Sequence, residues 1–310
     1  MGRLVILTVT LNPALDVSYG VDALVPHGSH RVRSIVERAG GKGVNVASVL
    51  HDVGVPCVAL LLARGAAGRA MAVDLESRGL SHDMVRGAGE SRRTVNVVSK
   101  ESGDATIFNE PGPSISAAEI AAVVARVQEH VLAGATVVAV SGSLPDPAKV
   151  DAYALVVLAA RAAGAQTIVD TEGPALRAAC AAGADVAMPN RKELLDSTET
   201  DEESAGVKVL QTLGARNVLV SAGPEGMRAV LADGRTLAVR PGRRLSGNPT
   251  GAGDAATAAV AAGLATGRGW PDIVRDAVAW SGAAVLQPVA GAVDWGDIVR
   301  LRAGATVEEA

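Results

Sequence analysis

The sequence predicts an α/β protein with a central, mostly parallel sheet flanked by helices. Short β-branched apolar runs alternate along the chain with alanine- and leucine-rich stretches, and glycines follow many of those stretches. Strands buried on both faces read as near-continuous apolar runs, and a left-handed glycine commonly ends a helix. Such alternation implies a parallel sheet, whose ligands bind beyond the carboxyl ends of the strands.

The predicted elements follow this alternation from the N-terminus onward. A small β-sheet lid over the ligand cleft is expected from 17–37 and 91–108, the second segment as a hairpin that turns at 101–104. No linker or repeat divides the 310 residues, so residues 1–310 are expected to form a single domain. Strands are expected at 5–10, 57–63, 136–141, 167–170, 185–188 and 218–221, and helices at 44–53, 117–132, 148–163 and 255–264.

Composition excludes several classes of partner. The net charge is −4 without blocks of like charge, and aromatic residues make up 2% of the chain. We therefore expect neither nucleic acid nor a membrane as partner. The two cysteines, Cys57 and Cys180, have no metal-binding spacing. They are expected to be reduced, apolar residues of a cytoplasmic protein.

The segment 248–254 (NPTGAGD) predicts a site for phosphoryl transfer. Its glycines let backbone N–H groups approach an anion, and the following helix adds partial positive charge at its N-terminus. The Asp254 carboxylate beside this anion site could take a proton from an attacking hydroxyl. The alternative interpretation is that Asp254 only caps the helix.

Two motifs near the N-terminus predict a polar ligand. Gly40-Gly41-Lys42-Gly43-Val44-Asn45 opens the backbone, with Lys42 offering charge and Asn45 a hydrogen-bonding amide. Asp16 follows the first strand and can accept hydrogen bonds from sugar hydroxyls. The alternatives are a glycine-rich turn before a helix and a turn-stabilising aspartate.

Three further motifs follow later strands. The first is 141–145 (SGSLP). The second is Asn190 with Glu193, which can form a capping box or reach a hydrated magnesium ion. The third is 221–226 (SAGPEG), which either lets a nucleotide approach or forms an ordinary hairpin turn.

Together the motifs resemble the PfkB family of sugar kinases, which has the ribokinase-like fold. Its two signatures are matched by GGKGVNVA at 40–47 and TGAGD at 250–254. TLNPALD at 10–16, NEPGP at 109–113, SGSLP at 141–145 and PNRKEL at 189–194 match as well, so the resemblance covers nearly the whole chain. It is strongest to the branch of 1-phosphofructokinase and tagatose-6-phosphate kinase, which the lysine at position 42 favours.

The resemblance implies a role for each matching position. Asp254 would be the catalytic base, and the backbone of Gly251, Ala252 and Gly253 would form the anion hole. The substrate side would comprise Asp16, Arg31, Gly40, Gly41, Lys42, Asn45, Arg92 and Ser141, with Arg31 and Arg92 near the substrate phosphate. The ATP side would comprise Asn190, Ser221, Gly223, Gly226 and Gly253, with Mg²⁺ held by Asn190 and Glu193 through water.

The activity implied is ATP-dependent phosphorylation of a ketohexose phosphate, with fructose 1-phosphate going to fructose 1,6-bisphosphate. Tagatose 6-phosphate and fructose 6-phosphate are alternative substrates, and a homodimer through the lid is expected. A non-catalytic sugar-phosphate sensor is disfavoured because Asp254 and both glycines are present. A dinucleotide-dependent oxidoreductase would need GxGxxG after the first strand, where 12–14 reads NPA. Met188 stands where the family has lysine, which predicts the loss of a nucleotide-phosphate contact.

Overall fold

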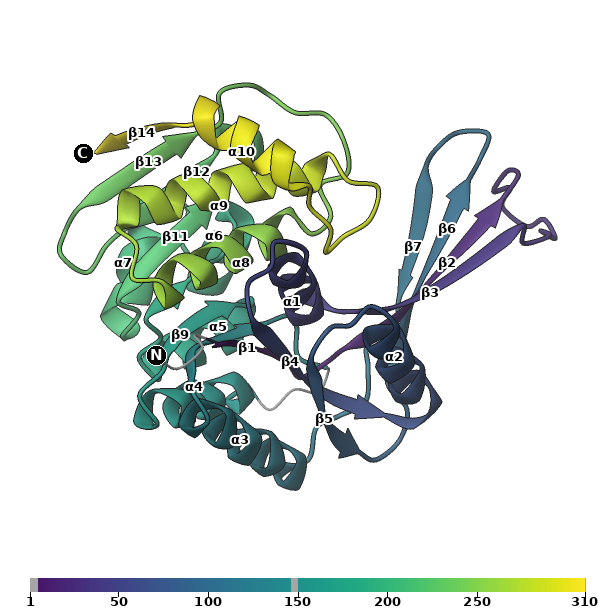
Figure 1. Ribbon diagram of the computed structural model, residues 1–310, viewed down its shortest axis with the longest axis horizontal. Helices are drawn as coiled ribbons and strands as arrows, with labels where there is room; N and C mark the ends of the chain where they lie inside the picture. Colours follow the sequence, from purple (N-terminus) through teal and green to yellow (C-terminus); the bar gives the residue numbers. More distant parts are fainter. Residues whose placement is uncertain (1–4, 146–149, 310) are drawn as a thin grey trace.

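The computed structural model has one large sheet with helices on both faces (Figure 1), and it describes residues 5–145 and 150–309. Within these residues ten strands pair in the order β5-β4-β1-β8-β9-β10-β11-β12-β13-β14. Neighbours from β5 to β11 are parallel, and those from β11 to β14 are antiparallel, which confirms a mostly parallel sheet. The strands are β1 (Val5–Thr10), β4 (Cys57–Arg64), β5 (His82–Gly87), β8 (Ala135–Ser141), β9 (Gln166–Asp170), β10 (Val186–Ala187), β11 (Asn217–Ser221), β12 (Met227–Val230), β13 (Thr236–Arg240) and β14 (Thr306–Glu309).

Each face of this sheet has its own apolar core because side chains alternate along a strand. In β1, Leu7 and Val9 pack with α3, α4, α5 and α7, whereas Ile6 packs with α1, α8, α9 and α10. Burial on both faces explains why the strands are almost continuously apolar. The helices are α1 (Lys42–Asp52), α2 (Gly65–Ser77), α3 (Ala117–Leu132), α4 (Ala152–Ala162), α5 (Gly173–Ala181), α6 (Arg191–Thr198), α7 (Glu203–Leu213), α8 (Ala252–Ala265), α9 (Trp270–Val285) and α10 (Trp295–Gly304).

Local signals account for the elements that were predicted best. The helix expected at 117–132 has the same bounds as α3, because Ser116 and Glu119 form a capping box at its start. The helix expected at 148–163 begins at Ala152 in the described residues, and positions 148–149 lie outside them. The strand expected at 185–188 is only the two residues of β10. Strands β5, β13 and β14 were not predicted, whereas β12 agrees with the alternative interpretation of 221–226 as a hairpin turn.

A second sheet extends from the body of the molecule (Figure 1), in the order β3 (Ser34–Gly40), β2 (Ala14–Val21), β6 (Arg92–Ser99) and β7 (Ala105–Asn109). We call this four-stranded sheet the lid. Cross-strand register places Val17, Tyr19, Ile35, Val95 and Phe108 on one of its faces. The side chains near its base pack with α2, whereas Ile35 and Phe108 are 63% and 57% exposed. No helix in the described part of the chain is long and apolar enough to cross a membrane.

Candidate active site

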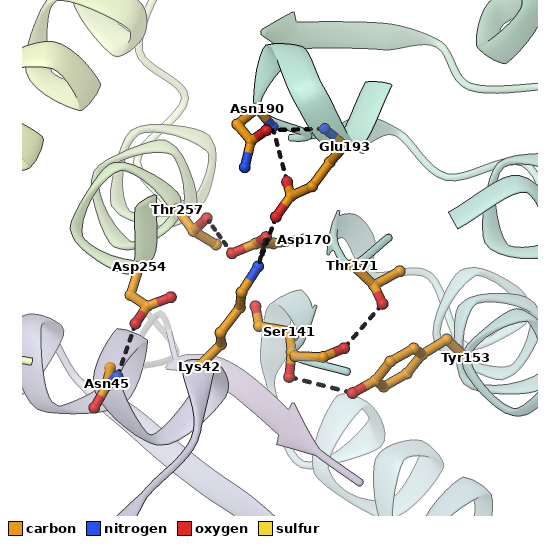
Figure 2. A network of polar contacts seen from close by, with 11 residues as sticks. Lys42, Asn45, Ser141, Tyr153, Asp170, Thr171, Asn190, Glu193, Asp254 and Thr257 are labelled. Carbon is orange, nitrogen blue, oxygen red and sulfur yellow. Dashed lines mark hydrogen bonds and ion pairs between the residues drawn. The ribbon is translucent and has the colours of Figure 1, made fainter. Parts of the chain in front are cut away.

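The carboxyl ends of the parallel strands gather most of the predicted polar side chains, as the fold requires. Asp170 ends β9, and Asn190 forms an isolated parallel bridge with Ser221, which ends β11. From the other side of this edge come Lys42 and Asn45 of α1 and Asp254 of α8. Segments from both halves of the sequence therefore meet at one point (Figure 2).

Asp254 lies in the first turn of α8 and is 5% exposed. The helix begins with Gly251 as the N-cap residue, so the alternative that Asp254 caps the helix is wrong. Asn45 Nδ2 donates to Asp254 Oδ2 at 2.8 Å. Burial, followed by the nearby charge of Asp170, raises the pKa of Asp254 to about 7, although Asn45 and Lys42 oppose the shift. The carboxyl can therefore exchange a proton near neutral pH.

The Lys42 ammonium group joins two carboxylates beside Asp254 (Figure 2). Its Nζ is 3.0 Å from Asp170 Oδ1 and 3.5 Å from Glu193 Oε1. The charge of Asp170 is the main cause that raises the pKa of Lys42, which keeps it protonated despite partial burial. Thr257 Oγ1 also donates to Asp170 Oδ2, at 3.4 Å. Asp170 is thus a central member of the site that was not singled out from sequence, although it ends a predicted strand.

The capping-box interpretation of Asn190 and Glu193 is confirmed. Asn190 Oδ1 accepts from the Glu193 N–H at 2.9 Å, and Glu193 Oε2 accepts from the Asn190 N–H at 2.9 Å. This is a capping box at the start of α6. The remaining oxygen of Glu193, Oε1, faces Lys42. The helix cap therefore holds a carboxylate in the site.

One side of this network opens into a cavity of about 460 Å³, which we call the acceptor cavity. Among the predicted substrate residues, Gly41, Lys42 and Arg92 line it, together with Asn12, Glu110, Glu172 and Glu193. Arg92 Nε donates to the Asn12 carbonyl at 3.1 Å, and Arg92 Nη1 donates to Thr94 Oγ1 at 3.4 Å. These bonds hold the guanidinium group at the cavity wall.

Asp16 and Gly40 lie next to each other behind this wall. A Cβ at Gly40 would approach Asp16 Oδ2 to 2.0 Å, so the position has no room for a side chain. Burial raises the pKa of Asp16, against the effects of a Thr94 hydrogen bond and the Arg92 charge. The carboxylate and Arg92 are therefore electrostatically coupled.

Two residues expected to contact the substrate do not line the acceptor cavity. The loop between β2 and β3 lies at the far end of the lid (Figure 1), and Arg31 is exposed on this loop. Ser141 ends β8 in register with Asp170, but it is fully buried, and its Oγ has no hydrogen-bond partner among the described residues. Ser143, two residues further on, lines the cavity.

On the other side of Asp254 lies a second cavity of about 430 Å³, which we call the nucleotide cavity. The predicted residues Ser221, Gly223, Gly226, Ala252 and Gly253 line it. The interpretation of 221–226 as a hairpin turn is confirmed, since Ser221 pairs with Met227 in the β11–β12 hairpin.

The predicted anion hole has fewer free donors than expected. The Ala252 N–H already donates to the Pro249 carbonyl at 3.2 Å. Gly253 faces open space, because a Cβ there would meet no atom within 4 Å. Met188 is 7% exposed and belongs to the apolar core against α8, so it brings no charge to the cavity.

Comparison with known proteins agrees with this geometry. Residues 9–295 match the model of the pfkB family of carbohydrate kinases. The chain belongs to the PfkB carbohydrate kinase family. A "1-phosphofructokinase" from Xanthomonas campestris pv. campestris is 39% identical over 269 residues, which cover 83% of each protein. An "ATP-dependent 6-phosphofructokinase isozyme 2" from Escherichia coli is 30% identical, over 91% of this chain and 92% of the relative.

The structure of this kinase also resembles a solved one. Phosphofructokinase-2 from Escherichia coli in complex with potassium superimposes with a TM-score of 0.88 at 28% identity, over 98% of this chain and 99% of that chain. The predicted family and the predicted fold class are therefore confirmed. A carbohydrate kinase of this family takes ATP as its co-substrate, and the two cavities that flank Asp254 offer room for a donor and an acceptor.

Proposed function

We propose that this kinase transfers the γ-phosphate of ATP to a ketohexose phosphate, and that fructose 1-phosphate is converted to fructose 1,6-bisphosphate. The observation that carries the proposal is a buried carboxyl, Asp254, whose neighbours line two cavities of different character: Gly253 lines the nucleotide cavity and Lys42 the acceptor cavity. The relative named 1-phosphofructokinase is more similar than the one named 6-phosphofructokinase, at 39% against 30% identity. Tagatose 6-phosphate and fructose 6-phosphate remain the alternative acceptors.

In this mechanism Asp254 is the base. A hydroxyl of the bound sugar attacks the γ-phosphorus in line, the bond to the β-phosphate oxygen breaks, and the hydroxyl proton passes to Asp254. Asn45 holds the carboxylate through Oδ2, which leaves Oδ1 for the proton. The N–H groups at the start of α8, with Gly253 facing open space, would stabilise the negative charge of the transferred group.

The acceptor phosphate would bind to Arg92. In the described residues its guanidinium forms no ion pair with a carboxylate, and its two hydrogen bonds go to a carbonyl and a hydroxyl. Lys42 already forms ion pairs with Asp170 and Glu193, so its charge is less available to a substrate phosphate. Because Arg31 lies at the lid tip, the phosphate subsite within one chain rests on fewer cations than the sequence suggested.

Magnesium fits the donor set of the network. Mg²⁺ prefers oxygen ligands, keeps several waters and binds substrate phosphates together with one or two carboxylates. Glu193 Oε1 and Asp170 Oδ1 both lie within 3.5 Å of Lys42 Nζ. The described residues contain no group of three or more His, Cys, Asp or Glu side chains that could hold a metal ion by itself, so the ion would depend on waters and phosphate oxygens for most of its ligands. Glu193 and Asn190 would hold the ion through water, and it would neutralise phosphate charge.

We also infer the setting in which the kinase acts. The apolar lid face that exposes Ile35 and Phe108 supports a homodimer in which two lids pack together. The free thiols of Cys57 and Cys180 support a cytoplasmic location. The two apolar cores on the faces of the large sheet contain residues from the beginning of the chain to its later helices, which supports a single domain with a lid.

The test is a coupled assay of ADP release over a panel of acceptors. The panel holds fructose 1-phosphate, fructose 6-phosphate and tagatose 6-phosphate beside fructose, ribose and adenosine, and kcat/KM is compared. We expect fructose 1-phosphate to give the highest value. An unphosphorylated sugar preferred by about tenfold would contradict the phosphate subsite, since that ratio corresponds to ~1.4 kcal/mol. Sugar-phosphate binding without turnover would instead favour a sensor.

A further inference from the structure

The nucleotide cavity is nearly free of charged side chains. Arg243 is its only ionisable lining residue among the described parts of the chain, and the rest are glycines, prolines, serines and apolar side chains. A nucleoside triphosphate carries several negative charges, which need nearby donors when they leave water. Among the described lining residues, the Arg243 side chain is therefore the one that can form an ion pair with the phosphates.

The loop that carries Arg243 is held at both ends. Gly242 packs against the backbone of α10, where a Cβ would come within 2.4 Å of the Gly304 carbonyl oxygen. At the other end, a Cβ on Gly247 would come within 2.1 Å of the Val285 carbonyl oxygen, and the Asn248 N–H donates to that same oxygen at 2.9 Å. The backbone between these anchors passes along the cavity, so Arg243 is placed by the fold.

The charge of Arg243 is available to a ligand. Within the described residues it forms no ion pair or side-chain hydrogen bond, although more than half of the arginines of this chain pair with a carboxylate. At the inner end of the site, by contrast, Lys42 is engaged by Asp170 and Glu193. Met188 is buried and uncharged. Lys42 lines the acceptor cavity and is already paired, so Arg243 is, within the described chain, the cation of the nucleotide-cavity lining that a phosphate could engage.

We propose that Arg243 binds the phosphates of the donor nucleotide and sets its affinity. This inference rests on the proposed function, because it assigns the 430 Å³ cavity to a nucleoside triphosphate. A guanidinium group forms charge-assisted hydrogen bonds with phosphate oxygens, and these are stronger than bonds between neutral groups. Arg244 is the matched control: it is exposed on the same loop, carries the same charge and does not line the cavity.

The experiment measures binding of AMPPNP with Mg²⁺, and of adenosine, by calorimetry on the full chain. Arg243→Ala should weaken AMPPNP about tenfold or more and adenosine less than about twofold, because only the phosphates lose a partner. Arg243→Lys should restore part of the affinity. Arg244→Ala should bind both ligands like the parent. The AMPPNP affinity of the parent should also fall more steeply with salt than that of Arg243→Ala.

Two results would overturn the assignment. Equal AMPPNP affinity in the Arg243→Ala and Arg244→Ala variants would show that Arg243 does not contact the nucleotide. An equal loss for adenosine and AMPPNP would place the guanidinium on the base instead of the phosphates. Failure of the proposed function has a different signature: the parent would bind AMPPNP but release no ADP with any acceptor of the panel.

Discussion

The two cavities beside Asp254 differ in how they are built. Charged side chains from α1, β6 and the strand ends line the acceptor cavity, including Lys42, Arg92 and Glu193. Backbone and small residues line the nucleotide cavity, with Arg243 as its one charge among the described residues. Under the proposed function, we expect side-chain charge to select the acceptor, and backbone shape together with the single charge of Arg243 to bind the donor. Variants can test this division because each cavity offers a matched pair of positions.

The largest effect is expected at the group between the cavities. Asp254→Asn should lower kcat by ~10²–10⁴-fold while binding of both substrates persists, because the amide cannot accept the proton. The measurement is steady-state kinetics together with calorimetric binding of each substrate. If kcat stayed within about threefold of the parent, Asp254 would not be the base.

The pH dependence of turnover should follow the same carboxyl. Asp254 must be ionised to accept a proton, and burial raises its pKa to about 7. This pKa belongs to the free enzyme, so kcat/KM should rise with pH and level off above about 7, with a loss of roughly tenfold per unit on the acid side. A kcat/KM that is flat from pH 5 to pH 8 would contradict this, and comparison with Asp254→Asn, whose residual rate should lack this limb, provides the control.

The acceptor side should respond next. Arg92→Ala should raise KM for the sugar phosphate about tenfold or more and leave KM for ATP nearly unchanged, because a charge-assisted bond to phosphate is lost. Arg93 is the matched control, since it is the next residue of β6 and lies outside the cavity lining. A KM that rises for Arg93→Ala and not for Arg92→Ala would move the phosphate subsite to the other face of the strand.

On the nucleotide side, alanine substitutions at Gly251 and Gly253 should have different effects, because the two glycines differ in backbone conformation and in the space around them. Gly251 has φ +85°, and a Cβ there would lie 3.0 Å from the Ala290 Cβ. Gly251→Ala should therefore lower the free energy of unfolding by roughly 1–2 kcal/mol. Gly253→Ala meets no neighbour and should leave that free energy unchanged or higher, while its methyl group raises KM for ATP. Equal melting temperatures for the two variants would contradict the role assigned to the Gly251 turn.

The smallest effect concerns stability. An unfolded aspartate has a pKa near 3.9, whereas the folded pKa of Asp254 is about 7. Between these values the folded state keeps a proton that the unfolded state has lost, so Asp254 makes stability fall as pH rises. Asp254→Asn removes this dependence and should melt a few degrees above the parent at pH 8 but not at pH 4. A difference that is the same at both pH values would contradict the raised pKa.

The sequence by itself determined the parts of this protein that depend on neighbouring residues. The capping box at Ser116 sets the start of α3, and apolar runs with glycine ends mark most of the parallel strands. The order of the glycine motifs predicted the family, and the position of Asp254 behind its turn predicted a site beside α8. Each of these signals comes from residues that are close together in the sequence, so it can be recognised without knowledge of the fold.

Only the tertiary structure decided which side chains meet. Asp170 joins Lys42 and Glu193 because β9 ends opposite α1 and α6, residues far apart in the chain. Ser141 is buried beside Asp170 and does not line the acceptor cavity, and Arg31 lies at the lid tip because the β2–β3 hairpin leads away from its base. Strand β14 was missed because its pairing partner, β13, lies far away in the chain, whereas β13 itself forms a local hairpin with β12 that the sequence analysis did not predict. Distance, register and side-chain direction are properties of the assembled sheet, and a linear pattern does not contain them.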